Sequence, residues 1–173
     1  MVDVNNLFKE KEFYNLIDVK ALENFSMGEL SEASGTISGK MSLSGTTLEP
    51  KYDGDFKFND AQFKITKLNV PFLLANEEIR LDNESFNFNN FKIQDASSNS
   101  IIVNGEVGTE SFVNPTFDLT IKAQNFKALN STKDDFDFVY GTVVFDADTK
   151  ITGDLNLPKV ELDLTVNSET DVT

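Results

Sequence analysis

The chain has 173 residues, a formal net charge of −14, and neither cysteine nor histidine. So acidic a protein is disfavoured as a partner of nucleic acid or anionic lipid headgroups, because both are bound through clustered Lys and Arg. Without Cys and His, disulfides, thiol chemistry, Ser-His-Asp and Cys-His catalysis and His/Cys zinc sites are excluded. Hydrophobic residues make up 39% of the chain and sixteen are Phe, enough apolar material for one folded domain.

The first 34 residues differ from the rest of the chain. No signal peptide is visible at residues 1–10, and no stretch reaches the roughly 18 apolar residues of a membrane span. We therefore expect Met1 to begin an excised piece of a longer protein. The compartment does not follow from composition, and residues 7–16 fit either a strand or a helix.

Two short helix signals follow. Asp18 can cap a short helix through residues 22–25 by accepting an early backbone N–H. Ser26 and Glu29 have capping-box spacing before Leu30. Both signals are local, so the region is expected to hold at most a short helix.

From Gly35 onward, apolar and polar residues alternate with the period of strands that have one apolar and one polar face. Gly, Asn, Asp and Pro gather between these runs, as turns require. Predicted turn sites are Asp82-Asn83, Ser98-Asn99 and Asp148-Thr149. The predicted strands are 36–45, 52–59, 61–68, 71–75, 78–82, 85–88, 90–95, 100–109, 116–124, 136–147, 149–156 and 159–167.

A faint internal repeat of the form Gly, strand, Pro, strand occurs in this region. Proline fixes φ and cannot donate to a ladder, so each Pro is predicted to mark the start of a returning strand. Either any meander would show such a pattern, or the sheet is repetitive and extendable; the recurring local order favours the second. The repeated segments are Gly39–Phe58 around Pro50, Gly105–Ala123 around Pro115 and Gly153–Val166 around Pro158.

Nothing in the sequence indicates catalysis or metal binding. Asp and Glu number 29, so any carboxylate pair is most simply a solvated surface pair. Asp146-Ala-Asp148 opens like a calcium loop, but Lys150 occupies the third ligand position, which favours a hairpin turn. We therefore predict no enzymatic activity, no cofactor and no metal site.

The apolar face of the strands is the candidate site. It fits a closed β-sandwich core, and it also fits an open trough that binds acyl chains, where burial gains about 0.8 kcal/mol per CH₂. An exposed apolar face can also make an isolated piece form an artificial homodimer. The predicted lining residues are Phe56, Phe58, Phe63, Ile65, Phe72, Leu74, Phe86, Phe88, Phe91, Ile93, Phe117, Leu119, Ile121, Phe136, Phe138, Phe145, Leu162 and Leu164. The same face is predicted to include Ile79, Leu81, Ile101, Val103, Val107, Val143, Leu155, Leu157 and Val160.

Several segments form a recognisable series through their order and spacing: 35–46, Pro50, 52–59, 68–77, 79–82, 88–95, 114–118, 125–132, Tyr140-Gly141 and 153–158. Together they resemble the C-terminal domain of the TamB family, the inner-membrane subunit of the translocation and assembly module, in the form found in Bacteroidetes-type bacteria. No single motif is specific, but their order and spacing are, and the resemblance covers residues 20–167.

The resemblance implies an all-β fold, in which an elongated, curled sheet forms a half-pipe, or β-taco, with an apolar interior. A short N-terminal strand and helix segment would occupy residues 1–34 and the trough residues 35–173. Proteins of this AsmA-like, bridge-like lipid-transfer group are anchored in the inner membrane of Gram-negative bacteria and span the periplasm. The implied partners are phospholipid acyl chains and an Omp85-type outer-membrane barrel. The implied alternative is a strand-pairing module that assists outer-membrane protein assembly.

Overall fold

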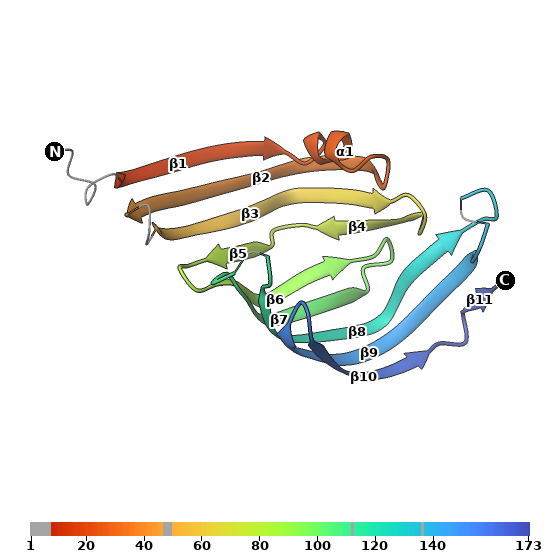
Figure 1. The fold of residues 1–173 in the computed structure, drawn as a ribbon. Coiled ribbons are helices and arrows are strands. Elements are labelled where there is room, and N and C mark those ends of the chain that lie inside the picture. Colours follow the sequence, from red (N-terminus) through yellow and green to blue (C-terminus); the bar gives the residue numbers. More distant parts are fainter. Residues whose placement is uncertain (1–7, 47–49, 112, 136) are drawn as a thin grey trace.

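The computed structural model describes residues 8–46, 50–111, 113–135 and 137–173, which form one curled antiparallel sheet (Figure 1). The elements are β1 (Phe8–Asp18), α1 (Ala21–Phe25), β2 (Leu30–Gly45), β3 (Pro50–Ile65), β4 (Val70–Leu74), β5 (Glu78–Leu81), β6 (Ser85–Gln94), β7 (Ser100–Gly108), β8 (Thr116–Ser131), β9 (Gly141–Asp154), β10 (Pro158–Val166) and β11 (Asp171–Val172). Their order in the sheet is β1-β2-β3-β4-β6-β7-β8-β9-β10, with β5 between β3 and β6 and β11 beside β9. The prediction of an all-β, curled sheet is confirmed.

The pairing register puts apolar residues on one face of the sheet and polar residues on the other. One row on the apolar face runs across β3 and β5–β10 through Phe56, Ile79, Phe88, Gly105, Leu119, Ile151 and Val160. The adjacent row on the polar face runs through Asp55, Arg80, Asn87, Glu106, Asp118, Thr152 and Lys159. Because side chains alternate along a strand, this register gives the sheet two chemically distinct faces.

Bulges keep the apolar face continuous where the alternation in the sequence breaks. Three of them centre on a left-handed residue: Asp60 in β3 (φ 45°), Asn90 in β6 (φ 49°) and Asn125 in β8 (φ 47°). A bulge adds one residue to its strand, so the flanking apolar residues are three positions apart instead of two, and the strand bends. These flanking pairs are Phe58 and Ala61, Phe88 and Phe91, and Ala123 and Phe126.

Residues on the neighbouring strand accommodate each bulge. The Asn90 N–H donates to Asn104 Oδ1 at 2.7 Å, and the Asn125 N–H donates to Asp146 Oδ1 at 2.6 Å. Opposite Asp60 lies Gly35, whose φ is +85° and whose added Cβ would lie 2.2 Å from the Asp60 carbonyl oxygen. Only glycine fits there, because the backbones approach too closely for any side chain.

The bulges correct several predicted strand ends. The predicted strands 52–59 and 61–68 merge into the single strand β3, which ends at Ile65, and the predicted strands 85–88 and 90–95 merge into β6, which ends at Gln94. The predicted turn at Asp148-Thr149, with its calcium-like opening, is wrong, since both residues lie within the continuous strand β9. Thr149 is a polar residue on the apolar face, paired with Ile121 and Leu162, and so it imitates a break. The predicted strand over 136–147 begins only at Gly141.

The other turn and proline predictions are confirmed. The chain turns at residues 82–84 between β5 and β6 and at 95–99 between β6 and β7. Pro50 and Pro158 open β3 and β10, and Pro115 directly precedes β8. Each therefore lies at the start of a returning strand, where its missing N–H disrupts no central part of a ladder.

Residues 8–30 combine a strand and one short helix. Residues 8–18 form β1, which pairs with β2. The predicted Asp18 cap is wrong: the N-cap is Lys20, and Asp18 Oδ1 accepts its N–H at 2.9 Å. No helix starts at Ser26. Instead, its hydroxyl donates to the Glu23 carbonyl and accepts the Leu30 N–H, which links the end of α1 to the start of β2.

A buried carboxylate fixes the β6–β7 turn against β8. Asp95 is 2% exposed. Its Oδ1 accepts the N–H groups of Ser97 and Asn99 at 2.8 and 2.9 Å. Its Oδ2 accepts the Asn99 side-chain amide at 3.1 Å and the Lys127 N–H at 2.9 Å. The side chain therefore holds the hairpin tip at the bulge where β8 extends beyond β7.

We expect Asp95→Asn to lower the free energy of unfolding by about 1–3 kcal/mol, because an amide NH₂ would face buried N–H donors. Urea unfolding at neutral pH measures the change. Asp118→Asn, on the exposed polar face, is the matched control. A loss no larger than the control's would contradict the assigned role of Asp95.

We expect acid to weaken the β5–β6 turn through Asp82. The Glu84 N–H, with further donors from Ser85 and Asn87, holds the pKa of the Asp82 carboxyl below its usual value, although desolvation opposes this. The resulting stability is present above the unfolded-state aspartate pKa of about 3.9 and is lost as pH falls through the lower folded pKa. Asp82→Asn should therefore lower stability near neutral pH and reduce its fall toward about pH 3. Unfolding curves measured across this pH range test the prediction. If the free energy of unfolding falls as steeply with decreasing pH in the variant as in the wild type, Asp82 does not contribute to the pH dependence.

Candidate functional site

The structure brings most of the predicted lining residues onto one face of the sheet. Their role in binding a ligand stays a prediction, but their shared position follows from the register and from the apolar clusters. They are Phe56, Phe58, Phe63, Ile65, Phe72, Leu74, Phe86, Phe88, Phe91, Ile93, Phe117, Leu119, Ile121, Phe145, Leu162 and Leu164.

Other predicted residues lie elsewhere. Phe138 is 81% exposed in the connection between β8 and β9, and Phe136 is outside the described residues. Leu155 and Leu157 lie between β9 and β10 and are 55% and 80% exposed. The apolar–polar alternation in the sequence continues past the ends of these strands. Outside a strand, alternation does not determine which way a side chain faces.

Exposure along the apolar face separates two regions. At the closed end, formed by Val70, Phe72, Ala123 and Phe126, side chains are between 1% and 7% exposed and form a single cluster. Along the open flank, formed by Val160, Leu162, Leu164 and Val166 of β10, exposure is between 49% and 57%. On β8, burial deepens from half-buried at Phe117, Leu119 and Ile121 to nearly complete at Ala123 and Phe126.

Four phenylalanines cross the closed end in a continuous row. Ring centroids are 5.9 Å apart between Phe63 and Phe72, 5.8 Å between Phe72 and Phe126, and 6.1 Å between Phe126 and Phe145. These contacts join β3 and β4 to β8 and β9. The two pairs of strands meet here because the β6–β7 hairpin, which lies between them in the sheet, turns between Gln94 and Ser100 and does not reach this far. Phe126 is 1% exposed and was not predicted as a lining residue. Its signal was the three-residue spacing from Ala123 across Asn125.

Hydrogen bonds also link the β3–β4 turn to the end of the β8–β9 hairpin. We call this contact the seam, and it consists of Leu68, Asn69, Asn130 and Asp135. The Asn130 N–H donates to the Leu68 carbonyl at 2.9 Å. The Asn69 amide donates to the Asn130 carbonyl at 3.2 Å and to Asp135 Oδ2 at 3.3 Å. Hydrogen bonds from Thr132, the backbone N–H first, lower the pKa of the Asp135 carboxyl. The carboxylate is therefore the charged acceptor that orients both sides of the seam.

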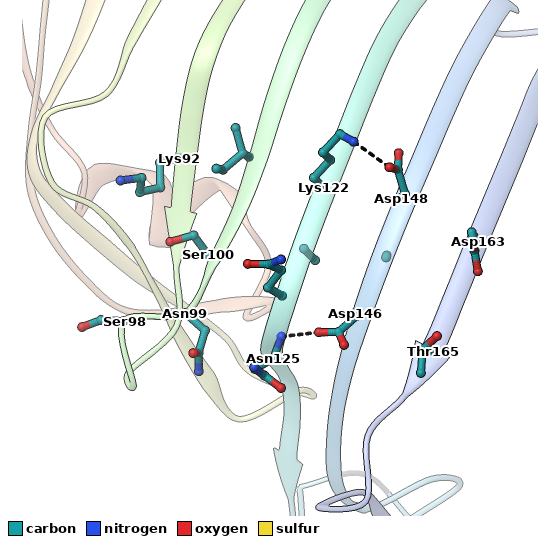
Figure 2. A pocket seen from close by; sticks show the side chains of 14 residues that line it. Lys92, Ser98, Asn99, Ser100, Lys122, Asn125, Asp146, Asp148, Asp163 and Thr165 are labelled. Carbon is teal, nitrogen blue, oxygen red and sulfur yellow. Dashed lines mark hydrogen bonds and ion pairs between the residues drawn. The ribbon is translucent and has the colours of Figure 1, made fainter.

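The polar face carries charges that already pair. Arg80 bridges Asp53 and Asp55, and the Asp55 hydrogen bond raises the pKa of the guanidinium. A depression of about 790 Å³ lies on this face, and Lys122 bonds Asp148 there at 2.6 Å. Figure 2 shows the side chains that line it. Asp146 in the same depression accepts the Asn125 N–H at 2.6 Å. Two of its acidic side chains are therefore already paired, and we assign no ligand to this surface.

Among residues 8–46, 50–111, 113–135 and 137–173, no group of three or more Asp, Glu, His or Cys side chains is placed to hold a metal ion. Within those same residues, no helix has the length and apolarity to cross a bilayer.

The fold and its apolar face define a class of protein: a single curled antiparallel sheet, apolar across its inner face and open along one flank. Residues 89–173, from within β6 to the last residue, match the family model described as the TamB C-terminal domain. The matched part of the chain belongs to the TamB family. Neither a curated protein nor a solved structure shows significant similarity to it.

We expect Leu162→Ser/Leu164→Ser to lower the fluorescence of an apolar-surface dye such as ANS by roughly half, because the dye binds contiguous exposed apolar surface. The melting temperature should change little, since both side chains are half exposed on an edge strand. Glu161→Ser/Asp163→Ser alters the opposite face of β10 and serves as the control. Equal dye binding by both variants would show that the open flank is not the accessible apolar surface.

Proposed function

We propose that the chain is a segment of a periplasmic lipid conduit, in which the apolar face carries phospholipid acyl chains between the inner and outer membranes. The observation that carries the proposal is the open flank: four apolar side chains on β10, each about half exposed. Across β9 they are in register with the half-buried Leu119 and Ile121 of β8. A soluble protein rarely exposes such a row without a partner that covers it.

The chemistry of the two faces suits this cargo. An acyl chain on the open flank would gain about 0.8 kcal/mol per buried CH₂ without directional bonds, so it can slide. The headgroup would stay in water beyond the β10 edge. The charge of −14 gives the polar face no general attraction for anionic headgroups, so binding would depend on the tails.

The family supports the proposal in a coarser form. TamB-family domains belong to transport and assembly components that span the bacterial periplasm, with roles in lipid transport and outer-membrane protein assembly. In this proposal the sheet is one stretch of a longer trough. The longer trough would link an inner-membrane anchor with an Omp85-type outer-membrane barrel.

A second function is favoured by the edge of β10. Among the described strands, β10 pairs only with β9, and every residue of β10 is exposed. Such an edge can add an amphipathic strand from an outer-membrane protein client. Strand addition would use the backbone edge, whereas lipid binding would use the apolar side chains, so substitutions on the apolar face separate the two.

We expect Leu119→Asp to abolish uptake of a fluorescent phospholipid from vesicles, because a carboxylate in the trough must be desolvated when a tail binds. Thr120→Asp places the same charge on the polar face of the same strand and should keep uptake. Circular dichroism checks that both variants fold. Leu162→Ser, on the exposed edge strand, gives a milder second test and should weaken uptake.

Full uptake by folded Leu119→Asp would overturn the conduit proposal. If uptake is absent in the wild type while a strand-mimicking amphipathic peptide still crosslinks to β10, the strand-pairing function is the better account.

A further inference from the structure

We propose that the end of the β8–β9 hairpin, residues 126–131 with 141–145, is a gate on the lipid path, closed in this structure. The inference rests on the proposed conduit. When the gate is closed, Phe126 stacks on Phe72 and the trough ends at Ala123. A tail that passes beyond Ala123 must part the hairpin end from β4.

The hairpin end is attached to the rest of the sheet on one side by few contacts. The last residue that β8 pairs with β7 is Gln124, opposite Ser100. Beyond it, β8 pairs with β9 through Phe126–Ser131. This part of β9 also pairs with Val166 of β10 and with β11, so these strand ends form one unit with the hairpin end. On the side that faces β4, this unit is held by the seam and by the stacking of Phe126 on Phe72. Among the described residues, one backbone hydrogen bond crosses the seam, from the Asn130 N–H to the Leu68 carbonyl.

Local backbone conformation provides pivots on both sides. Asn125 has φ 47° and lies in the bulge where the hairpin end leaves the sheet. Asn69 has φ 53° and lies in the β3–β4 turn that carries the other half of the seam. Asp95 anchors the base of the hairpin end by accepting the Lys127 N–H. A hinge of this kind needs a few terminal or loop residues that absorb the change in φ and ψ.

An acyl chain can supply the free energy for opening. In the closed state Phe126 is 1% exposed and Phe72 is 7% exposed. Separating the two rings would bring them into contact with water, which is unfavourable. A tail inserted between them replaces these lost contacts with new apolar ones. The lipid therefore has a differential affinity for the open state, the only property through which a ligand can shift such an equilibrium.

The test uses a phospholipid with a diazirine at the end of one acyl chain, with labelled peptides mapped by mass spectrometry. Because the chain has no Cys, Asn69→Cys/Asp135→Cys can be linked across the seam by a short bis-methanethiosulfonate that reductant cleaves. In wild type we expect label on β8, on β10 and on β4. In the linked variant we expect label on β4 to be lost, label on β8 and β10 to remain, and reduction to restore β4.

Lys122→Cys/Asp148→Cys is the matched control, since these residues face each other across β8 and β9 on the polar face. Linking this pair should leave the label on β4 unchanged. Equal β4 labelling in the linked and reduced seam variant overturns the gate, and so does a wild type labelled on β8 and β10 but never on β4. Absence of label everywhere overturns the conduit itself, and the gate with it.

Discussion

The rest of the structure depends on one constraint, that neighbouring strands keep their apolar rows in register across the whole sheet. A slip of one residue would turn an entire strand's apolar set toward the polar face. At Asp60, Asn90 and Asn125 the chain inserts one left-handed residue, so the next apolar side chain returns to the same face. The bulges also bend the strands, so register and curvature share one physical cause.

Curvature then divides the apolar face into a core and an accessible surface. Where β8 and β9 extend past β7, they reach β4, and the row from Phe63 to Phe145 fills the interior. Among the described strands β10 pairs only with β9, and its apolar side chains stay half exposed. The same side-chain chemistry thus stabilises the fold at one end and offers a binding surface at the other. The proposed gate lies at the boundary between them.

The sequence predicts the faces better than it predicts the ends of strands. Alternation over Phe117, Leu119 and Ile121 identifies the apolar face, because a period of two has only one structural meaning there. Phe126 could not be found that way, since the bulge at Asn125 shifts the period, and Thr149 imitated a turn because it is polar on the apolar face. The closed end depends on contacts between strands far apart in sequence, such as Phe72 with Phe126, which local patterns do not encode.

Native mass spectrometry, with lipid extraction, on folded protein purified without detergent measures directly whether the apolar face binds lipid. A lipid conduit should carry phospholipid at near-integer stoichiometry and release it on heating, because the open flank has apolar surface that a tail can cover. A mass equal to that of the bare polypeptide, with no uptake from added liposomes, would mean that the apolar face is not a lipid site. It would leave the edge of β10 as the remaining candidate for function.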